Sequence, residues 1–193
     1  MTTDRTKQAL RVEARELRDR EAANAGPAAL EVSGWAADLL ALSRVERPIV
    51  SSYLVIGSEL DPAPLTDRLK ELGATTALPV MTAKAAPLEF RTWMPGGPLV
   101  SREWGIREPG PDCAVVEPDI LLVPLLLVGR TGHRLGYGGG FYDRTLERLR
   151  SRKSIVAIGF SYLFQKVDAV PQEAYDQPLD YLLTPSGFEK FQP

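Results

Sequence analysis

Glycines crowd one stretch of the chain, between an apolar segment and a segment with helical spacing. Four of them fall within five residues, at Gly136, Gly138, Gly139 and Gly140. Glycine lets the backbone take positive φ and approach a ligand closely. Successive N–H groups can then converge on an anion, and a helix that follows adds the positive end of its dipole. The stretch therefore predicts a phosphate-binding loop, called the glycine loop below (residues 136–140).

Charged side chains flank the glycine loop. Arg134 precedes it, Arg144 follows it, and Asp143 lies at its exit. Arginines pair with phosphate oxygens, and a carboxylate at the exit could hold the magnesium ion that accompanies ATP. A lone glycine loop can also be only a tight turn, but a turn needs none of these charges. The loop is not a Walker A loop, and the Gly-x-Gly-x-x-Gly dinucleotide spacing is absent.

Composition narrows the class of protein. The 193 residues are 44% hydrophobic and 25% charged, which predicts one domain spanning 1–193. A net charge of −2 argues against nucleic-acid or anionic-membrane partners. One cysteine, Cys113, and one histidine, His133, exclude a Cys/His metal cluster and disfavour Ser-His-Asp or Cys-His catalysis. The N-terminal stretch is charged and lacks an apolar core, and no apolar stretch reaches membrane-spanning length, so we expect no signal peptide and a cytoplasmic protein. We also expect a monomer.

Helical and strand patterns alternate along the chain. They predict helices over 4–23, 27–42, 63–72 and 142–150, and strands over 49–56, 75–81, 88–94, 119–124, 155–160 and 181–183. Helix 27–42 is expected to turn Leu30, Trp35, Leu39 and Leu40 inward. The fold class predicted is α/β, a single three-layer domain with a mostly parallel sheet and helices on both faces. Strand 119–124 is the most apolar and should be central.

These elements would bring further charged residues to the loop. Glu59 and Asp61 follow strand 49–56, at the edge where open α/β sheets bind ligands. Asp61 can instead cap the helix that Pro62 begins, so Glu59 is the better functional candidate. Lys7 and Arg11 lie four apart on one helical face, which is either part of the site or a solvated basic face.

The ordered blocks of the chain resemble the 5-formyltetrahydrofolate cyclo-ligase family, also called methenyltetrahydrofolate synthetase. Segments 119–124 and 132–144 carry the closest likeness, and the glycine block is the individually specific motif. The other blocks follow in order over nearly the whole chain: Lys7-x-x-x-Arg11, Glu59-Leu-Asp, Leu88-x-Phe90-x-x-Trp93, Trp104-Gly-Ile-x-Glu-Pro109, and Gln165 to Thr184.

The resemblance implies an ATP- and Mg²⁺-dependent enzyme that closes 5-formyltetrahydrofolate to 5,10-methenyltetrahydrofolate. It implies catalytic roles for Arg134 and Tyr142, and magnesium ligation by Asp143 and Asp176. The folate would contact Leu54, Glu59, Trp104 and Tyr142. The residues implied for ATP are Lys7, Arg11, Arg134, Leu135, Gly136, Tyr137, Gly138, Gly139, Gly140, Phe141 and Tyr142.

The chain departs from the family pattern at two places. Val128 and Gly129 stand where an aromatic–aspartate pair is usual, and Tyr175 stands where a histidine commonly precedes the aspartate. The first departure keeps open a second interpretation, an ATP-dependent enzyme of the same fold with another small substrate. A third is a nucleotide- or folate-binding regulator without turnover, which the intact 134–143 block disfavours.

Overall fold

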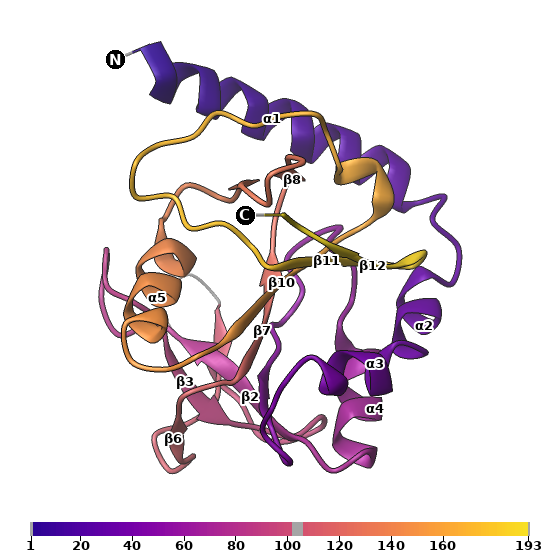
Figure 1. Cartoon of the computed structure of the whole chain (residues 1–193), viewed down its shortest axis with the longest axis vertical. Helices are drawn as coiled ribbons and strands as arrows, with labels where there is room; N and C mark the ends of the chain where they lie inside the picture. Colours follow the sequence, from indigo (N-terminus) through magenta and orange to yellow (C-terminus); the bar gives the residue numbers. More distant parts are fainter. Residues whose placement is uncertain (1, 102–105, 193) are drawn as a thin grey trace.

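The computed structural model describes residues 2–101 and 106–192, and its helices flank a central sheet (Figure 1). The helices are α1 (Thr2–Ala22), α2 (Ala28–Ser33), α3 (Ala36–Ala41), α4 (Ala63–Glu71), α5 (Phe141–Arg150) and the short 3₁₀ helix η2 (Leu163–Gln165). The strands are β1 (Ile49–Ser51), β2 (Thr75–Val80), β3 (Glu89–Thr92), β4 (Val100–Ser101), β5 (Arg107–Glu108), β6 (Val115–Val116), β7 (Ile120–Pro124), β8 (Leu127–Val128), β9 (Arg134–Leu135), β10 (Val156–Phe160), β11 (Tyr181–Thr184) and β12 (Gly187–Lys190).

The main sheet has the strand order β12-β11-β10-β7-β1-β2-β3-β6. Strands β11, β10, β7, β1 and β2 are parallel to one another, and β12, β3 and β6 join antiparallel at the two edges. Strand β7 is central, and residues 120–123 are fully buried because the sheet is covered on both faces. The predicted mostly parallel α/β sheet, with 119–124 at its centre, is confirmed.

Alternate residues of β7 supply the two cores. Ile120 and Leu122 pack on the face covered by α2, α3 and α4. Leu121 and Val123 pack on the other face, against Leu146 of α5. Side chains in a strand point to opposite faces in turn, so one apolar run serves both layers. Helix α1 runs across one end of this arrangement, near β8 (Figure 1).

The predicted single helix over 27–42 is wrong. The chain forms two short helices with a break at Gly34 and Trp35. The break lets Trp35 pack edge-on against Phe188 of β12, at 6.2 Å between ring centroids. Leu30, expected to face inward, is 65% exposed. The tertiary contact of Trp35 outweighs the helical pattern here.

The predicted strand 49–56 ends early, at Ser51. Ser52 still donates its backbone N–H to the carbonyl of Ala77 at 2.9 Å, and the chain then leaves the sheet. Residues 53–62 are thereby freed to line a cavity. A second difference is the β8–β9 hairpin, which stands between β7 and the glycine loop and places Arg134 opposite Val128.

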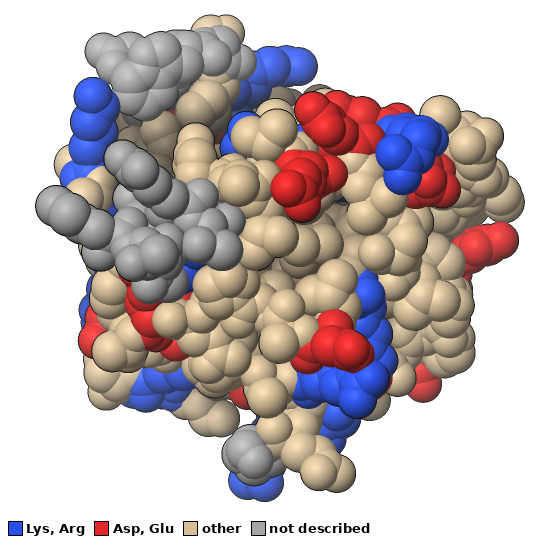
Figure 2. Space-filling view, turned by 90° about the horizontal axis from the view of Figure 1, so that it is seen from above, with Lys and Arg blue, Asp and Glu red and all other residues tan. Residues whose placement is uncertain are grey.

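Acidic and basic side chains are interspersed with wide uncharged areas on the face shown in Figure 2. The cations that matter below are not on such a surface, since Lys7, Arg18 and Arg134 are buried. No helix within the described residues is long and apolar enough to cross a membrane.

Candidate active site

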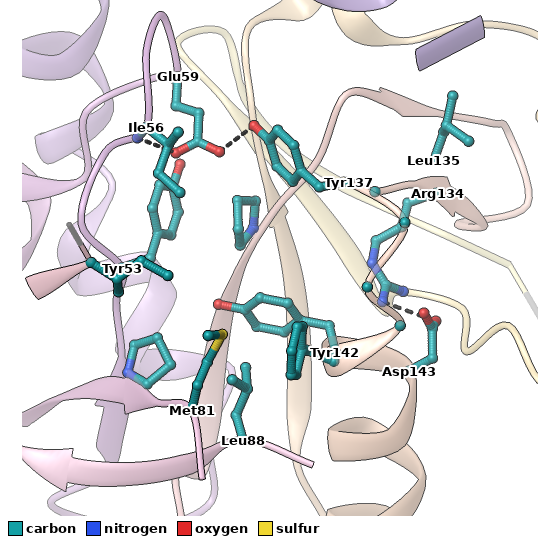
Figure 3. Close-up of a pocket in the computed structure, with 18 of the residues that line it drawn as sticks. Tyr53, Ile56, Glu59, Met81, Leu88, Arg134, Leu135, Tyr137, Tyr142 and Asp143 are labelled. Carbon is teal, nitrogen blue, oxygen red and sulfur yellow. Dashed lines mark hydrogen bonds and ion pairs between the residues drawn. The ribbon is translucent and has the colours of Figure 1, made fainter. Parts of the chain in front are cut away.

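A cavity of about 620 Å³ opens at the end of the sheet where β1 and β7 finish (Figure 3). Its wall combines α1, the segment after β1, the end of β2, β5, the glycine loop, the first turn of α5 and residues 173–176. The lining residues are Lys7, Arg11, Tyr53, Leu54, Ile56, Glu59, Leu78, Pro79, Met81, Leu88, Ile106, Arg107, Glu108, Pro124, Arg134, Leu135, Gly136, Tyr137, Gly138, Gly139, Gly140, Phe141, Tyr142, Asp143, Glu173, Tyr175 and Asp176.

The glycine loop needs glycine for two different reasons. Gly138 and Gly140 have φ of +98° and +62°, a backbone region that disfavours other residues. Gly136 has no such φ, and a Cβ added there would meet no protein atom within 4 Å. Space beside Gly136 is therefore open to a ligand. Gly140 precedes α5, whose N-terminus has no side-chain cap, so its N–H groups remain available to an anion.

Two arginines fix the carbonyls of this loop. Arg11 donates from Nε to the carbonyl of Gly136 at 3.0 Å. Arg144 donates from Nη2 to the carbonyl of Gly139 at 2.6 Å. Arg144 was predicted to be a phosphate partner, but it does not line the cavity. It holds the loop from behind, whereas Arg11 lies in the wall itself.

The buried Arg134 and the partly buried Asp143 form an ion pair at one end of the cavity (Figure 3). Nη2 of Arg134 lies 2.9 Å from Oδ1 of Asp143, and Nη1 donates to the carbonyl of Gln177 at 2.7 Å. The same Asp143 oxygen accepts the N–H of Gln177 at 3.1 Å. The C-terminal segment thus ties both residues in place.

Lys7 forms a second ion-pair cluster in the same wall. Its Nζ lies 2.6 Å from Glu173 Oε2 and 2.8 Å from Asp176 Oδ2. Burial opposes the charge on Lys7, but the hydrogen bonds and charges of Asp176 and Glu173 outweigh it and raise the pKa of Lys7. The amine therefore stays protonated. Lys7 is buried in the cavity wall and does not lie on a solvated basic face.

Glu59 lies across the cavity in a buried hydrogen-bonded network. Its Oε2 accepts the N–H of Ile56 at 2.8 Å, and its Oε1 accepts the hydroxyl of Tyr137 (Figure 3). Burial raises the pKa of Glu59, while the bonds from Tyr137 and Ile56 and the charge of Arg18 counter part of the rise. Asp61 has the local role expected of it, since its Oδ1 accepts the N–H of Ala63 at 2.9 Å at the start of α4.

Tyr142 places a buried hydroxyl in the middle of the cavity. Figure 3 shows it between Glu59 and the apolar side chains of Met81 and Leu88. Its Oη has no hydrogen-bond partner among the described residues. Burial raises the pKa of Tyr142, so the phenol stays protonated and can donate. A buried hydroxyl without a partner is costly, and a ligand in the cavity can satisfy it.

The structure brings nearly all the predicted site residues together. Arg144 and Asp61 do not line the cavity, and Trp104 lies outside the described residues; the other predicted site residues all line it. Asp143 and Asp176 share the cavity, but the described residues contain no group of three or more His, Cys, Asp or Glu able to hold a metal ion. Sequence reasoning missed Tyr53, Met81 and Glu173. Tyr53 and Met81 fall inside the predicted strands 49–56 and 75–81, and nothing in the sequence marked them as site residues.

The family departure at Val128 and Gly129 does not touch the cavity. Val128 is fully buried in the core under α5. A Cβ on Gly129 would lie 3.3 Å from the backbone of Ala169 and Val170. Tyr175, the second departure, does line the cavity and donates to Glu173 at 2.7 Å.

Comparison with known sequences matches residues 3–185 to the 5-formyltetrahydrofolate cyclo-ligase family. A 5-formyltetrahydrofolate cyclo-ligase of Mycolicibacterium smegmatis is 38% identical over 160 residues, covering 79% of each chain. One from Escherichia coli K12 is 37% identical over 142 residues, covering 71% of this chain and 78% of its own.

Solved structures show the same fold. A 5,10-methenyltetrahydrofolate synthetase of Aquifex aeolicus superposes with a TM-score of 0.69 at 22% identity, over 100% of this chain and 94% of its own. One from Mycoplasma pneumoniae also gives 0.69 at 22% identity, over 93% and 98%.

Proposed function

The chain belongs to the 5-formyltetrahydrofolate cyclo-ligase family, and from this premise we propose how its residues carry out the family's reaction. It is an ATP-dependent enzyme that closes 5-formyltetrahydrofolate to 5,10-methenyltetrahydrofolate, releasing ADP and phosphate. The formyl oxygen attacks the γ-phosphate to give an imino phosphate. The second folate nitrogen then attacks the activated carbon, and phosphate leaves. Such chemistry needs positioning and charge neutralisation more than a protein nucleophile.

The triphosphate would occupy the side of the cavity formed by the glycine loop and α1. The open space beside Gly136 and the uncapped start of α5 suit an anion. Lys7 and Arg134 supply positive charge there, but both are already paired with carboxylates. Phosphate oxygens would replace or share these partners.

Magnesium would be held by Asp143 and Asp176 together with phosphate oxygens and water. Mg²⁺ is commonly bound through one or two carboxylates and the substrate's phosphates, so two carboxylates in the cavity wall fit it without a larger cluster. Its contribution is to neutralise charge on the phosphates. Arg134 and Lys7, as partners of these carboxylates, fix where the oxygens lie.

The folate ring would bind on the opposite side, against Glu59. A carboxylate has about four lone-pair positions, and two at Glu59 are used by Ile56 and Tyr137. The remaining positions can accept N–H groups of the ring. Tyr53, Leu54 and Met81 provide apolar surface for its faces.

The observation that carries this assignment is the partnerless Tyr142 hydroxyl between the two sides. A formyl group there would sit between the folate and the γ-phosphate. Because Tyr142 stays protonated, it can donate to the formyl oxygen or to the phosphoryl group as charge develops. Val128 and Gly129 do not line the cavity, so this departure from the family pattern does not favour a different substrate.

The test mixes purified protein with magnesium-ATP and 5-formyltetrahydrofolate and follows the absorbance of the methenyl product. We expect product only when both ATP and enzyme are present. Tyr142→Phe should bind both substrates and turn over far more slowly. Absence of product, with ATP and folate binding each confirmed, would contradict the proposed function. Unchanged turnover in Tyr142→Phe would contradict the role of its hydroxyl.

A further inference from the structure

Three cations of α1 lie on one stripe of the helix, and only two of them line the cavity. Lys7, Arg11 and Arg18 follow the spacing i, i+4, i+11, which keeps them on one face. Lys7 and Arg11 are in the cavity wall. Arg18 is 4% exposed and stands behind the wall, so it has no direct access to a ligand.

Arg18 contacts the substrate side of the site through four groups: Tyr137, Ser58, Ile56 and Glu59 itself. Its Nη1 lies 3.9 Å from Glu59 Oε1, which makes a buried ion pair. Its Nη1 donates to the hydroxyl of Tyr137, whose proton goes to Glu59 Oε1. Its Nε donates to Ser58 Oγ at 3.1 Å, and its Nη2 lies 3.5 Å from the carbonyl of Ile56. The guanidinium also lies 5.7 Å from the ring centroid of Tyr137. A buried charge is retained only where partners repay its desolvation, and here the partners all surround Glu59.

We propose that Arg18 is a positioning residue that holds the Glu59 carboxylate ready for the folate ring, through its ion pair with Glu59 and through the Tyr137 hydroxyl. The proposal rests on the function proposed above, in which Glu59 accepts hydrogen bonds from the substrate. Tyr137 belongs to the glycine loop, so this chain of contacts also joins the nucleotide side to the folate side. Without Arg18, the hydroxyl of Tyr137 would lose the donor that orients it. Residues 56–59 would lose the contacts that Arg18 makes with the Ser58 hydroxyl and the Ile56 carbonyl.

The charges around Glu59 make the effect depend on pH. Arg18 faces it from α1, Tyr137 from the glycine loop, Tyr53 from the segment after β1 and Tyr142 from α5. Arg18 is the only cation among these four. Burial raises the pKa of Glu59 and Arg18 limits the rise. Removing the cation should therefore move the loss of folate binding on acidification to higher pH.

The experiment measures the Kd of 5-formyltetrahydrofolate without ATP, and the Kd of magnesium-ATP without folate, each as a function of pH. In Arg18→Met we expect folate Kd to rise about tenfold or more, the effect of losing charge-assisted hydrogen bonds. ATP Kd should stay within about twofold, since Lys7 and Arg11 are untouched. Arg18→Lys, which keeps the charge, should restore the pH profile and part of the affinity. Arg20→Met, on the same helix and 66% exposed at its side chain, is the matched control and should change nothing.

Two results would overturn the proposal. One is an unchanged folate Kd in Arg18→Met. The other is a parallel loss of ATP and folate binding, which a merely structural role in docking α1 would produce. If Arg18→Met does not fold, Arg18→Gln takes its place, with the same expected split between folate and ATP and the same overturning results. The variant Glu59→Gln distinguishes failure of the Arg18 proposal from failure of the proposed function. If Glu59→Gln leaves the folate Kd unchanged, Glu59 itself is not part of the substrate site.

Discussion

The two sides of the cavity differ in whether their polar groups already have protein partners. On the nucleotide side, Lys7, Arg11 and Arg134 already bind protein acceptors: carboxylates for Lys7 and Arg134, a loop carbonyl for Arg11. On the folate side, Glu59 has a raised pKa and Tyr142 has a hydroxyl without a partner among the described residues. Under the proposed assignment, ATP would replace hydrogen-bond partners that its site already has, whereas folate would supply a partner to the Tyr142 hydroxyl. We infer that nucleotide binding is limited by this exchange and that folate binding carries the greater selectivity.

The largest test of the comparison removes a cation from the nucleotide side. Arg134→Ala should reduce kcat/KM for ATP by about 100- to 1,000-fold, as loss of a preorganised charge at a reacting phosphate does. It also leaves Asp143 without its cation. Arg130→Ala is the control, because Arg130 forms an exposed ion pair with Asp168 away from the cavity. Steady-state kinetics with varied ATP would measure both; turnover unchanged in Arg134→Ala would mean that the phosphate site is misplaced.

Glu59→Gln tests the folate side. Loss of a charged acceptor should weaken 5-formyltetrahydrofolate binding about 10- to 100-fold, with little change in ATP binding. The ionised carboxylate is the binding form and its pKa is raised. Wild-type affinity should therefore fall as pH drops through that raised pKa, earlier than for an ordinary glutamate, and be full above it. In calorimetric titrations, Glu59→Gln should not show this fall in affinity at low pH. If the fall persists in the variant, it arises from the titration of another group.

The variant Asp143→Asn tests whether a carboxylate that is paired with Arg134 also binds magnesium. We expect the magnesium concentration for half-maximal rate to rise about tenfold, at the lower end of what disturbing a metal site costs. The Arg134 contact would be weakened at the same time, so ATP Kd at saturating magnesium is the companion measurement. A magnesium titration that superimposes on the wild type would take Asp143 out of the metal site.

The smallest expected effects come from two glycine variants that should differ in stability, one at the open position Gly136 and one at Gly140, which has positive φ. Gly136→Ala should fold normally, because its Cβ would enter open space, and should raise the KM for ATP by about threefold or more. Gly140→Ala puts a Cβ 2.8 Å from Arg144 Nη1 at positive φ, and should lose about 1–2 kcal/mol of stability. Thermal unfolding and ATP kinetics on both variants would show the contrast. Equal stability losses would contradict the open space at Gly136.

The residues that line the glycine-loop side of the cavity were easier to predict from the sequence than those that line the Glu59 side. The glycine loop, Arg134 and Asp143 are close in sequence, so local chain geometry and a family motif locate them together. Tyr53 and Met81 reach the cavity because β1 and β2 end where they do, which no local pattern specifies. Arg18 did have a signal, the helical spacing it shares with Lys7 and Arg11.

Two errors of the prediction, one in the fold and one in the site, have the same physical cause. Helix 27–42 is broken because Trp35 packs against Phe188, which lies over 150 residues away in the chain. Glu173 was missed because its partner Lys7 is 166 residues away. The central strand 119–124, by contrast, was predicted because its own residues are almost all apolar, which indicates a buried strand. Local periodicity finds elements, but long-range contacts decide where some of them end.

The way α1 closes the site has a consequence for how the enzyme is made. Lys7 reaches Asp176 across 169 residues, and Arg18 reaches Tyr137 across 119. During synthesis, α1 leaves the ribosome long before either partner exists. A nascent chain that ends before residue 173 can pair β1, β2 and β7, yet Lys7 has neither of its carboxylate partners. Under the proposed assignment, the Lys7 part of the ATP site is therefore completed only after residue 176 has been made, when the earliest helix meets a late segment of the chain.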